Sequence, residues 1–223
     1  MNIAIDGPAG SGKSTIAKIA AGRLKFIYVD TGAMYRALAL YCIRAGVDIS
    51  KEEEVRKVLP DIHIRIAYDE DGQQVYLNGE NVSGLIRTEQ VSASTSKVSA
   101  YPCVRAKLLD LQRNLAKEND VIMDGRDIGT NILPDAELKI YLTASVKERA
   151  GRRYKELLEK GEEVSLGQIE EEISQRDYQD KNRETAPLRQ AEDAVYLDTT
   201  GLTIQQVSDK VCRLALGRMK EWK

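Results

Sequence analysis

Residues 2–14 read Asn-Ile-Ala-Ile-Asp-Gly-Pro-Ala-Gly-Ser-Gly-Lys-Ser. The first five form a short apolar run that ends at an aspartate, as expected of a buried parallel strand, and Gly7–Ser14 fits the pattern G-x-x-x-x-G-K-[S/T]. Apolar residues at helical spacing follow, so the loop lies between a strand and a helix. Its glycines allow backbone N–H groups to surround a phosphate, and the helix N-terminus adds the positive end of its dipole. These residues therefore predict a nucleoside triphosphate site rather than a glycine-rich turn without a ligand.

Two side chains of this loop and one from elsewhere predict its chemistry. Lys13 is placed to reach the β- and γ-phosphates, and the Ser14 hydroxyl is placed to bind Mg²⁺. Asp124 stands at the tip of another apolar run, where it can orient the water shell of the metal. The predicted ATP-binding residues are Gly7, Pro8, Ala9, Gly10, Ser11, Gly12, Lys13, Ser14 and Thr15.

Short apolar runs separated by helical patterns continue along the chain. They predict five strands, at residues 2–6, 26–30, 120–124, 138–142 and 194–198. Strands that alternate with helices favour a parallel sheet with helices on both faces. A helix around 204–219 closes this unit.

One stretch departs from the alternating pattern. Residues 62–82 show a period of two, and Asp71-Gly72 and Asn78-Gly79 are typical hairpin turns. We expect a small antiparallel sheet inserted at 58–97 into an α/β core of residues 1–57 and 98–223. The small residues of 91–100 predict a helix, and the insertion is interpreted as a flap on the substrate side.

Composition excludes several classes of protein. The 223 residues carry a net charge of −2, so binding to nucleic acid polymers is not indicated. No apolar run is long enough to cross a bilayer, and no signal peptide is evident. The three cysteines are far apart and lack metal-ligand spacing, which favours a protein of the reducing cytoplasm. We expect a monomer.

The triphosphate site alone does not define the activity. A GTPase would need Asn-Lys-x-Asp after a strand, which the chain lacks, and a motor ATPase is usually larger. His63 is the single histidine, so no Ser-His-Asp or Cys-His arrangement exists for hydrolysis. A short chain with an inserted flap favours a phosphotransferase that shields its reaction from water.

Three charged clusters accompany the loop. In 30–36, Arg36 either faces the same cleft as the phosphate loop or is a surface arginine on a helix that Thr31 caps. In 124–130, Arg-Asp follows a strand end. In 176–183, Arg176, Asp180 and Arg183 share a helical face. The 176–183 cluster could equally be a solvated helix held by ion pairs. A fourth group, Arg149, Arg152 and Arg153, precedes a hinge-like stretch at 159–163. It fits either an ordinary charged helix or a helical lid near 149–165, and on the second interpretation Arg153 contributes to catalysis.

Together these residues resemble the bacterial cytidylate kinase family along nearly the whole chain. The matching segments are 5–14, 30–36, 124–130, 176–183 and Ala186-Pro187-Leu188. The first segment is shared by many kinases, whereas the next three are specific to this family. The resemblance implies a phosphate-loop nucleoside-monophosphate-kinase fold, with a five-stranded parallel sheet in the order 2-3-1-4-5. Thr31 is a mild departure, since many relatives carry serine there.

The resemblance also implies an activity and residue roles, namely ATP-dependent phosphorylation of CMP and dCMP. Arg36, Arg126 and Arg183 would bind the CMP phosphate and act in catalysis with Lys13. Ser96, Arg105 and Asp127 would bind the cytosine, and Arg176 with Asp180 the ribose; Thr31 completes the CMP set. The assignment is chemically consistent, because cytosine offers an N4 donor to a carboxylate whereas uracil would turn O4 toward it. Two alternatives stay open, a kinase of another small acceptor and a nucleotide-sensing module without turnover.

Overall fold

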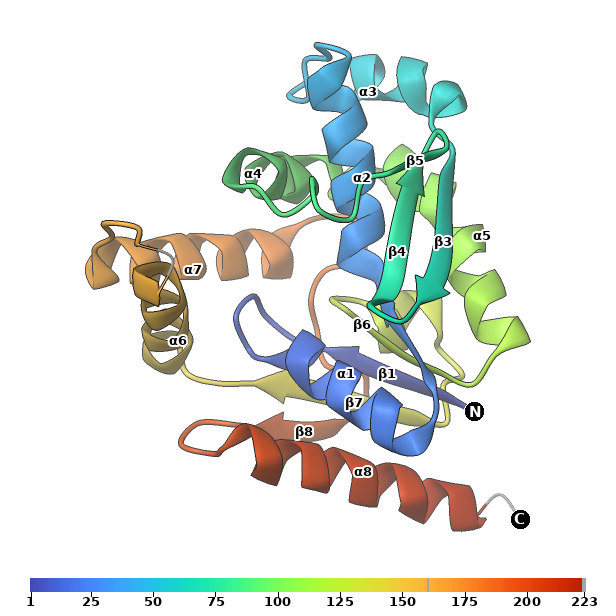
Figure 1. Cartoon of the computed structure of the whole chain (residues 1–223), viewed down its shortest axis with the longest axis vertical. Helices are drawn as coiled ribbons and strands as arrows, with labels where there is room; N and C mark the ends of the chain where they lie inside the picture. The colour runs from blue at the N-terminus through green and yellow to red at the C-terminus, as the bar shows by residue number, and fades with distance from the viewer. Residues whose placement is uncertain (160, 222–223) are drawn as a thin grey trace. The chain divides into compact units, whose positions relative to one another are not determined.

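The computed structural model describes residues 1–159 and 161–221 (Figure 1). The chain forms two compact units. The first contains Met1–Ile27 and the chain from Asn119 onward, and the second is Tyr28–Glu118. None of the described helices has the length and apolar character needed to cross a membrane.

A parallel sheet lies at the centre of the first unit. Strand β1 (Asn2–Asp6) pairs with β6 (Val121–Gly125) on one side and with β7 (Leu138–Thr143) on the other, and β7 pairs with β8 (Val195–Asp198). The middle residues of β1 and β6 are wholly buried, which explains why these strands are continuous apolar runs rather than alternating ones. With β2 (Ile27–Asp30) at its edge, the sheet has the order β2-β6-β1-β7-β8.

Among the described residues, four α-helices belong to the first unit. Helix α1 (Lys13–Leu24) packs against α8 (Ile204–Glu221), and Arg23 of α1 forms an ion pair with Asp209 of α8. Helices α6 (Val146–Glu159) and α7 (Leu166–Asn182) form a hairpin. This hairpin has a small apolar core of its own, made by Ala150, Leu157, Ile169 and Ile173. One turn of π-helix, η2 (Ile128–Ile132), follows β6.

The second unit surrounds helix α2 (Thr31–Arg44), most of whose side chains are buried. Helix α2 contacts the small sheet and the helices α4 (Glu89–Val98) and α5 (Pro102–Glu118). The short helices α3 (Glu52–Val58) and η1 (Leu59–Asp61) precede the sheet.

The small sheet is antiparallel and has the order β3-β4-β5. Its strands are β3 (Ile64–Asp69), β4 (Gly72–Leu77) and β5 (Glu80–Asn81). Asn78 and Gly79 have φ of 49° and 89°, and this left-handed conformation suits the Asn-Gly pair in the turn between β4 and β5.

The predicted fold is confirmed. All five predicted strands of the large sheet are present within one residue of their expected ends, and their order along the sheet is the predicted one. The inserted antiparallel sheet and the helix of small residues are also present. The domain boundaries at 57/58 and 97/98 stay a prediction, and Lys160, within the predicted lid, lies outside the described residues.

Two local predictions are wrong. Arg183 does not lie on a helical face with Arg176 and Asp180, because α7 ends at Asn182 and Arg183 has extended backbone angles. The Leu188 N–H instead donates to the Asp180 carbonyl at 2.7 Å, which folds the following loop back on the helix end. Thr31 does not cap α2; Asp30 does, accepting from the Ala33 N–H at 3.0 Å.

Candidate active site

The phosphate loop joins β1 to α1 and depends on glycine for its shape. A Cβ on Gly7 would lie 2.0 Å from the Leu142 carbonyl oxygen, so no larger residue fits there. Gly12 has φ of 85° at the start of α1, and no side chain of the described residues caps this helix. The buried Ser11 hydroxyl oxygen likewise has no hydrogen-bond partner within the described part of the chain. The uncapped N-terminus of α1 and the Ser11 hydroxyl are therefore suited to bind a phosphate.

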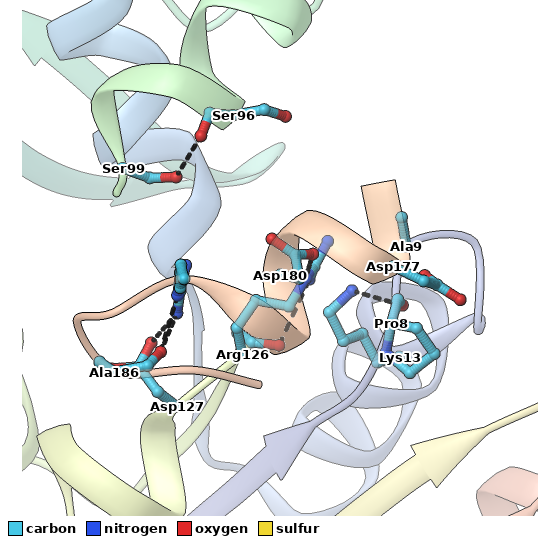
Figure 2. A network of polar contacts seen from close by, with 12 residues as sticks. Pro8, Ala9, Lys13, Ser96, Ser99, Arg126, Asp127, Asp177, Asp180 and Ala186 are labelled. Atoms are coloured by element: carbon cyan, nitrogen blue, oxygen red, sulfur yellow. Dashed lines mark hydrogen bonds and ion pairs between the residues drawn. The ribbon is translucent and has the colours of Figure 1, made fainter. Parts of the chain in front are cut away.

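Lys13 is buried at the base of this loop. Its Nζ donates to the Pro8 carbonyl at 3.4 Å (Figure 2). Burial lowers the pKa of Lys13 to about 7, and the positive charge of Arg126 adds to this effect, while Asp124 opposes it. A bound polyanion would relieve this destabilisation of the ammonium ion, which makes the position well suited to phosphate.

Ser14 and Asp124 are the residues predicted to bind a magnesium ion. The Ser14 hydroxyl donates to Asp124 Oδ2 at 2.7 Å, although the two residues are 110 positions apart. A hydroxyl and a carboxylate beside a triphosphate loop form the oxygen-rich set that Mg²⁺ prefers. The residues present therefore fit the metal.

Two ion pairs bring predicted acceptor residues together. Arg126 Nε donates to Asp180 Oδ2 at 2.7 Å (Figure 2), and Arg183 donates to Asp127 Oδ1 at 3.2 Å. Arg183 is oriented further by the Ala186 carbonyl, which accepts from its Nε at 2.7 Å. Burial alone would lower the pKa of Arg126, but the surrounding carboxylates, Asp180 first and then Asp124 and Asp177, together outweigh it and the pKa is raised. Burial alone would raise the pKa of Asp180, but Arg126, with Arg176 and Arg183, outweighs it and the pKa is lowered.

Sequence reasoning missed Asp6, at the end of β1. Its carboxylate oxygens accept from the Ile128 and Gly129 N–H groups at 2.7 and 2.8 Å, so they hold the turn that follows Asp127. Burial raises the pKa of Asp6 to about 7 despite these bonds. The only signal in the sequence is a charged residue that ends an otherwise buried strand, and that signal does not name its partners.

The remaining predicted CMP residues belong to the second unit. Arg105 is buried, donates to the Ser99 carbonyl at 3.2 Å, and has its guanidinium carbon 5.6 Å from the centre of the Tyr35 ring. Ser96 lies in α4, and its carbonyl accepts from the Ser99 hydroxyl at 3.3 Å (Figure 2). Thr31 and Arg36 lie in α2, and an Arg36 nitrogen lies 3.2 Å from where a Cβ on Gly32 would be.

The three lid arginines differ sharply in environment. Arg153 is 46% exposed and pairs with Glu156 at 3.1 Å, so its predicted catalytic role stays a prediction. Arg152 donates to the Thr199 carbonyl at 3.2 Å, and one of its nitrogens lies 3.7 Å from a Cβ built on Gly12. Arg149 is buried and bonded within the protein. Arg149, which donates to the Ala9 carbonyl, and Arg152 both lie beside the phosphate loop.

These features define a phosphate-loop kinase. The central strand of a parallel sheet leads into the loop, which is accompanied by a buried lysine, a hydroxyl–carboxylate pair and a helical hairpin rich in arginine. Comparison with known proteins gives a narrower answer. A model of the cytidylate kinase family matches residues 3–216, and the chain belongs to that family. The resemblance stated above is thereby confirmed.

Known cytidylate kinases are similar to the chain along nearly its whole length. The chain is 49% identical over 217 residues to a cytidylate kinase from Geobacillus thermodenitrificans (strain NG80-2), covering 97% of each chain. It is 52% identical over 214 residues to one from Caldicellulosiruptor saccharolyticus, covering 96% of this chain and 95% of the relative. Among solved structures, an uncharacterized protein from Eubacterium ventriosum ATCC 27560 matches with a TM-score of 0.53 and 11% identity, over 96% of this chain and 97% of its own, and this likeness concerns the fold alone.

Proposed function

We propose that this enzyme transfers the γ-phosphoryl group of ATP to CMP and dCMP, giving ADP with CDP or dCDP. The observation that carries the proposal is the placement of Lys13 and the phosphate loop in one unit with Arg126, Asp180 and Arg183. Membership of the cytidylate kinase family supports the choice of acceptor.

For the donor, we propose that residues 7–15 bind the ATP phosphates. The N–H groups at the N-terminus of α1 and the protonated Lys13 would neutralise their charge. Ser14 would bind Mg²⁺ directly and Asp124 through water, which the 2.7 Å contact between their side chains favours. When bound, the metal would supply positive charge that offsets the charge of the phosphates.

For the acceptor, we propose that Arg36, Arg126 and Arg183 bind the CMP phosphate. Ser96, Arg105 and Asp127 would bind the base, Arg176 and Asp180 the ribose, and Thr31 would lie at the edge of this set. The insertion at 58–97 would act as a flap on this side. The ion pairs of Arg126 and Arg183 support the proposal, because they hold guanidinium groups in fixed orientations before a phosphate arrives.

The mechanism we propose is direct in-line transfer without a covalent intermediate. A phosphate oxygen of CMP is already anionic at neutral pH, so no general base is needed. The task of the protein is to bring two polyanions together and to spread the developing charge, which Lys13 and the arginines do electrostatically. Closure of the lid, with Arg153 on it, would exclude water and prevent waste of ATP. A monomeric state and a cytoplasmic location stay predictions.

The test is ADP release from ATP and Mg²⁺ with CMP, dCMP, UMP, AMP or GMP as acceptor, for the native chain and for Asp127→Asn. We expect CMP and dCMP to be strongly preferred. We also expect the preference for CMP over UMP, as a ratio of kcat/KM, to fall at least tenfold in the variant, because an amide can donate to the uracil O4. Asp135→Asn, an exposed site in the same unit, is the control. If no monophosphate stimulates ADP release, the proposed function is refuted.

A further inference from the structure

Arg149 is the most completely enclosed arginine of the lid. Its side chain is 3% exposed, although it stands in the first turns of α6. Its Nε donates to the Ala144 carbonyl at 2.9 Å, just before the helix. Its two terminal nitrogens donate to both carboxylate oxygens of Asp177, at 3.1 and 2.5 Å.

The same guanidinium also reaches the phosphate loop. One terminal nitrogen donates to the Ala9 carbonyl at 2.9 Å, so Ala9 and Asp177 share a donor and lie together (Figure 2). The neighbouring Gly10 also lies against Arg149, since a Cβ there would be in van der Waals contact with the Arg149 Cβ, at 3.4 Å. Four of the five N–H groups of the guanidinium are therefore used inside the protein.

The partners of Arg149 lie next to residues of both proposed sites, the ATP site and the CMP site. Ala9 stands next to Pro8, whose carbonyl holds Lys13. Asp177 follows Arg176 along α7 and lies one turn before Asp180, which holds Arg126. The bidentate pair fixes both the position and the rotation of α7, because a fork-shaped donor constrains the carboxylate in a plane.

We propose that Arg149 is a positioning residue that couples the phosphate loop to helix α7. Its role is not to contact the transferred phosphate but to set the position of Arg176 and Asp180 relative to the loop that holds ATP. This assignment rests on the proposed function for its effect on turnover, but the coupling itself is a property of the chain and can be measured with ATP alone. Lysine in place of Arg149 would keep the charge, but its single nitrogen would not span Ala9, Ala144 and both oxygens of Asp177.

The direct test is hydrogen–deuterium exchange of the native chain and of Arg149→Lys, each with and without MgATP. In the native protein we expect ATP to slow exchange both in peptides of 7–14 and in peptides of α7. In Arg149→Lys we expect protection of the loop to remain and protection of α7 to be lost. Equal ATP-dependent protection of α7 in both proteins would overturn the proposal, and so would its absence in the native protein.

Turnover gives the second readout. We expect Arg149→Lys to lower kcat with CMP at least tenfold, while the Kd for ATP changes less than threefold; an unchanged kcat would overturn the proposal. A purely structural residue would lower the unfolding midpoint but leave kcat per folded molecule unaltered. Arg23→Lys, in the exposed ion pair with Asp209, is the matched control. If Arg149→Lys does not fold, Asp177→Asn tests the same coupling from the other partner, with the same loss of α7 protection expected. Failure of CMP phosphorylation by the native chain would refute the proposed function and leave the exchange test intact.

Discussion

Replacing Asp6 by asparagine should change how the stability of the enzyme depends on pH. Burial raises the pKa of this carboxyl from 3.8 to about 7 in the folded protein. Between these two values the folded state binds more protons than the unfolded state, so the free energy of unfolding must fall as pH rises. Each pKa unit corresponds to about 1.4 kcal/mol, and the full difference is worth about 4 kcal/mol, as an order of magnitude. The stabilisation is present below pH 4 and is lost as pH approaches and passes 7.

Asp6→Asn removes the titration but keeps the size of the side chain. Its one carbonyl oxygen can accept from Ile128 or from Gly129 but not well from both, at a cost of about 1–3 kcal/mol. The variant should therefore have a lower free energy of unfolding than the native chain near pH 4.5. By pH 8 the two free energies should be equal, or the variant should be the more stable protein.

The assay is urea unfolding of both proteins at pH 4.5, 5.5, 6.5, 7.5 and 8.5, followed by circular dichroism. Subtracting the free energy of unfolding of the variant from that of the native chain cancels the titration of every other group that the substitution leaves undisturbed. Asp135→Asn, which changes an exposed carboxylate of the same unit, should differ from the native chain by no more than about 0.5 kcal/mol throughout. The free energy of unfolding of the native chain minus that of Asp6→Asn should fall as pH rises. If this difference is constant or grows with pH, the reasoning is refuted, because burial then does not favour protonation of Asp6.

Two further predictions concern charges at the site. Because the pKa of Lys13 is about 7 without ligand, ATP binding at pH 8 should take up close to one proton and weaken as pH rises; titration calorimetry in two buffers of different ionisation enthalpy measures this, and equal heats in both buffers would contradict it. Asp180→Ala should destabilise the fold by about 1.5–3 kcal/mol, because it leaves Arg126, a partly buried charge, without its carboxylate. The double variant Asp180→Ala with Arg126→Met should lose less than the sum of the single losses in urea unfolding, and strict additivity would show that the pair is not coupled.

Most of the fold could be predicted from local features of the sequence. A strand buried on both faces must be a continuous apolar run, and the phosphate loop identifies the strand that lies before it. The Asn78-Gly79 pair likewise identified its hairpin turn, because few other residues tolerate positive φ. The errors came at helix ends, where the decisive contacts are not local. Arg183 follows a regular charge spacing, yet the Leu188 N–H bond to Asp180 ends the helix before it.

The role of a side chain could be predicted where its partners belong to the same sequence motif. It could not be predicted where its partners lie far away in the sequence. Lys13 and Ser14 belong to a pattern whose spacing follows from the loop. Asp6 and Arg149 were missed or assigned another role, because their partners are backbone groups or side chains far away in sequence: the N–H groups of residues 128 and 129, and the carbonyl of Ala9. Buried charged groups must be paired or hydrogen-bonded, but this rule does not say which distant group will serve.

Asp6 and Arg149 have a common physical consequence. Each ends or flanks an element of the phosphate-loop region and holds a segment that carries proposed acceptor residues: Asp6 holds the turn after Asp127, and Arg149 holds the helix that carries Asp180. Both contacts are buried, so movement of either segment away from the loop would leave a buried polar or charged group without its partners, which is costly. The geometry between donor and acceptor phosphates would thus be fixed by side chains that touch neither nucleotide. Substitutions at these two positions should therefore impair turnover more than the binding of either substrate alone.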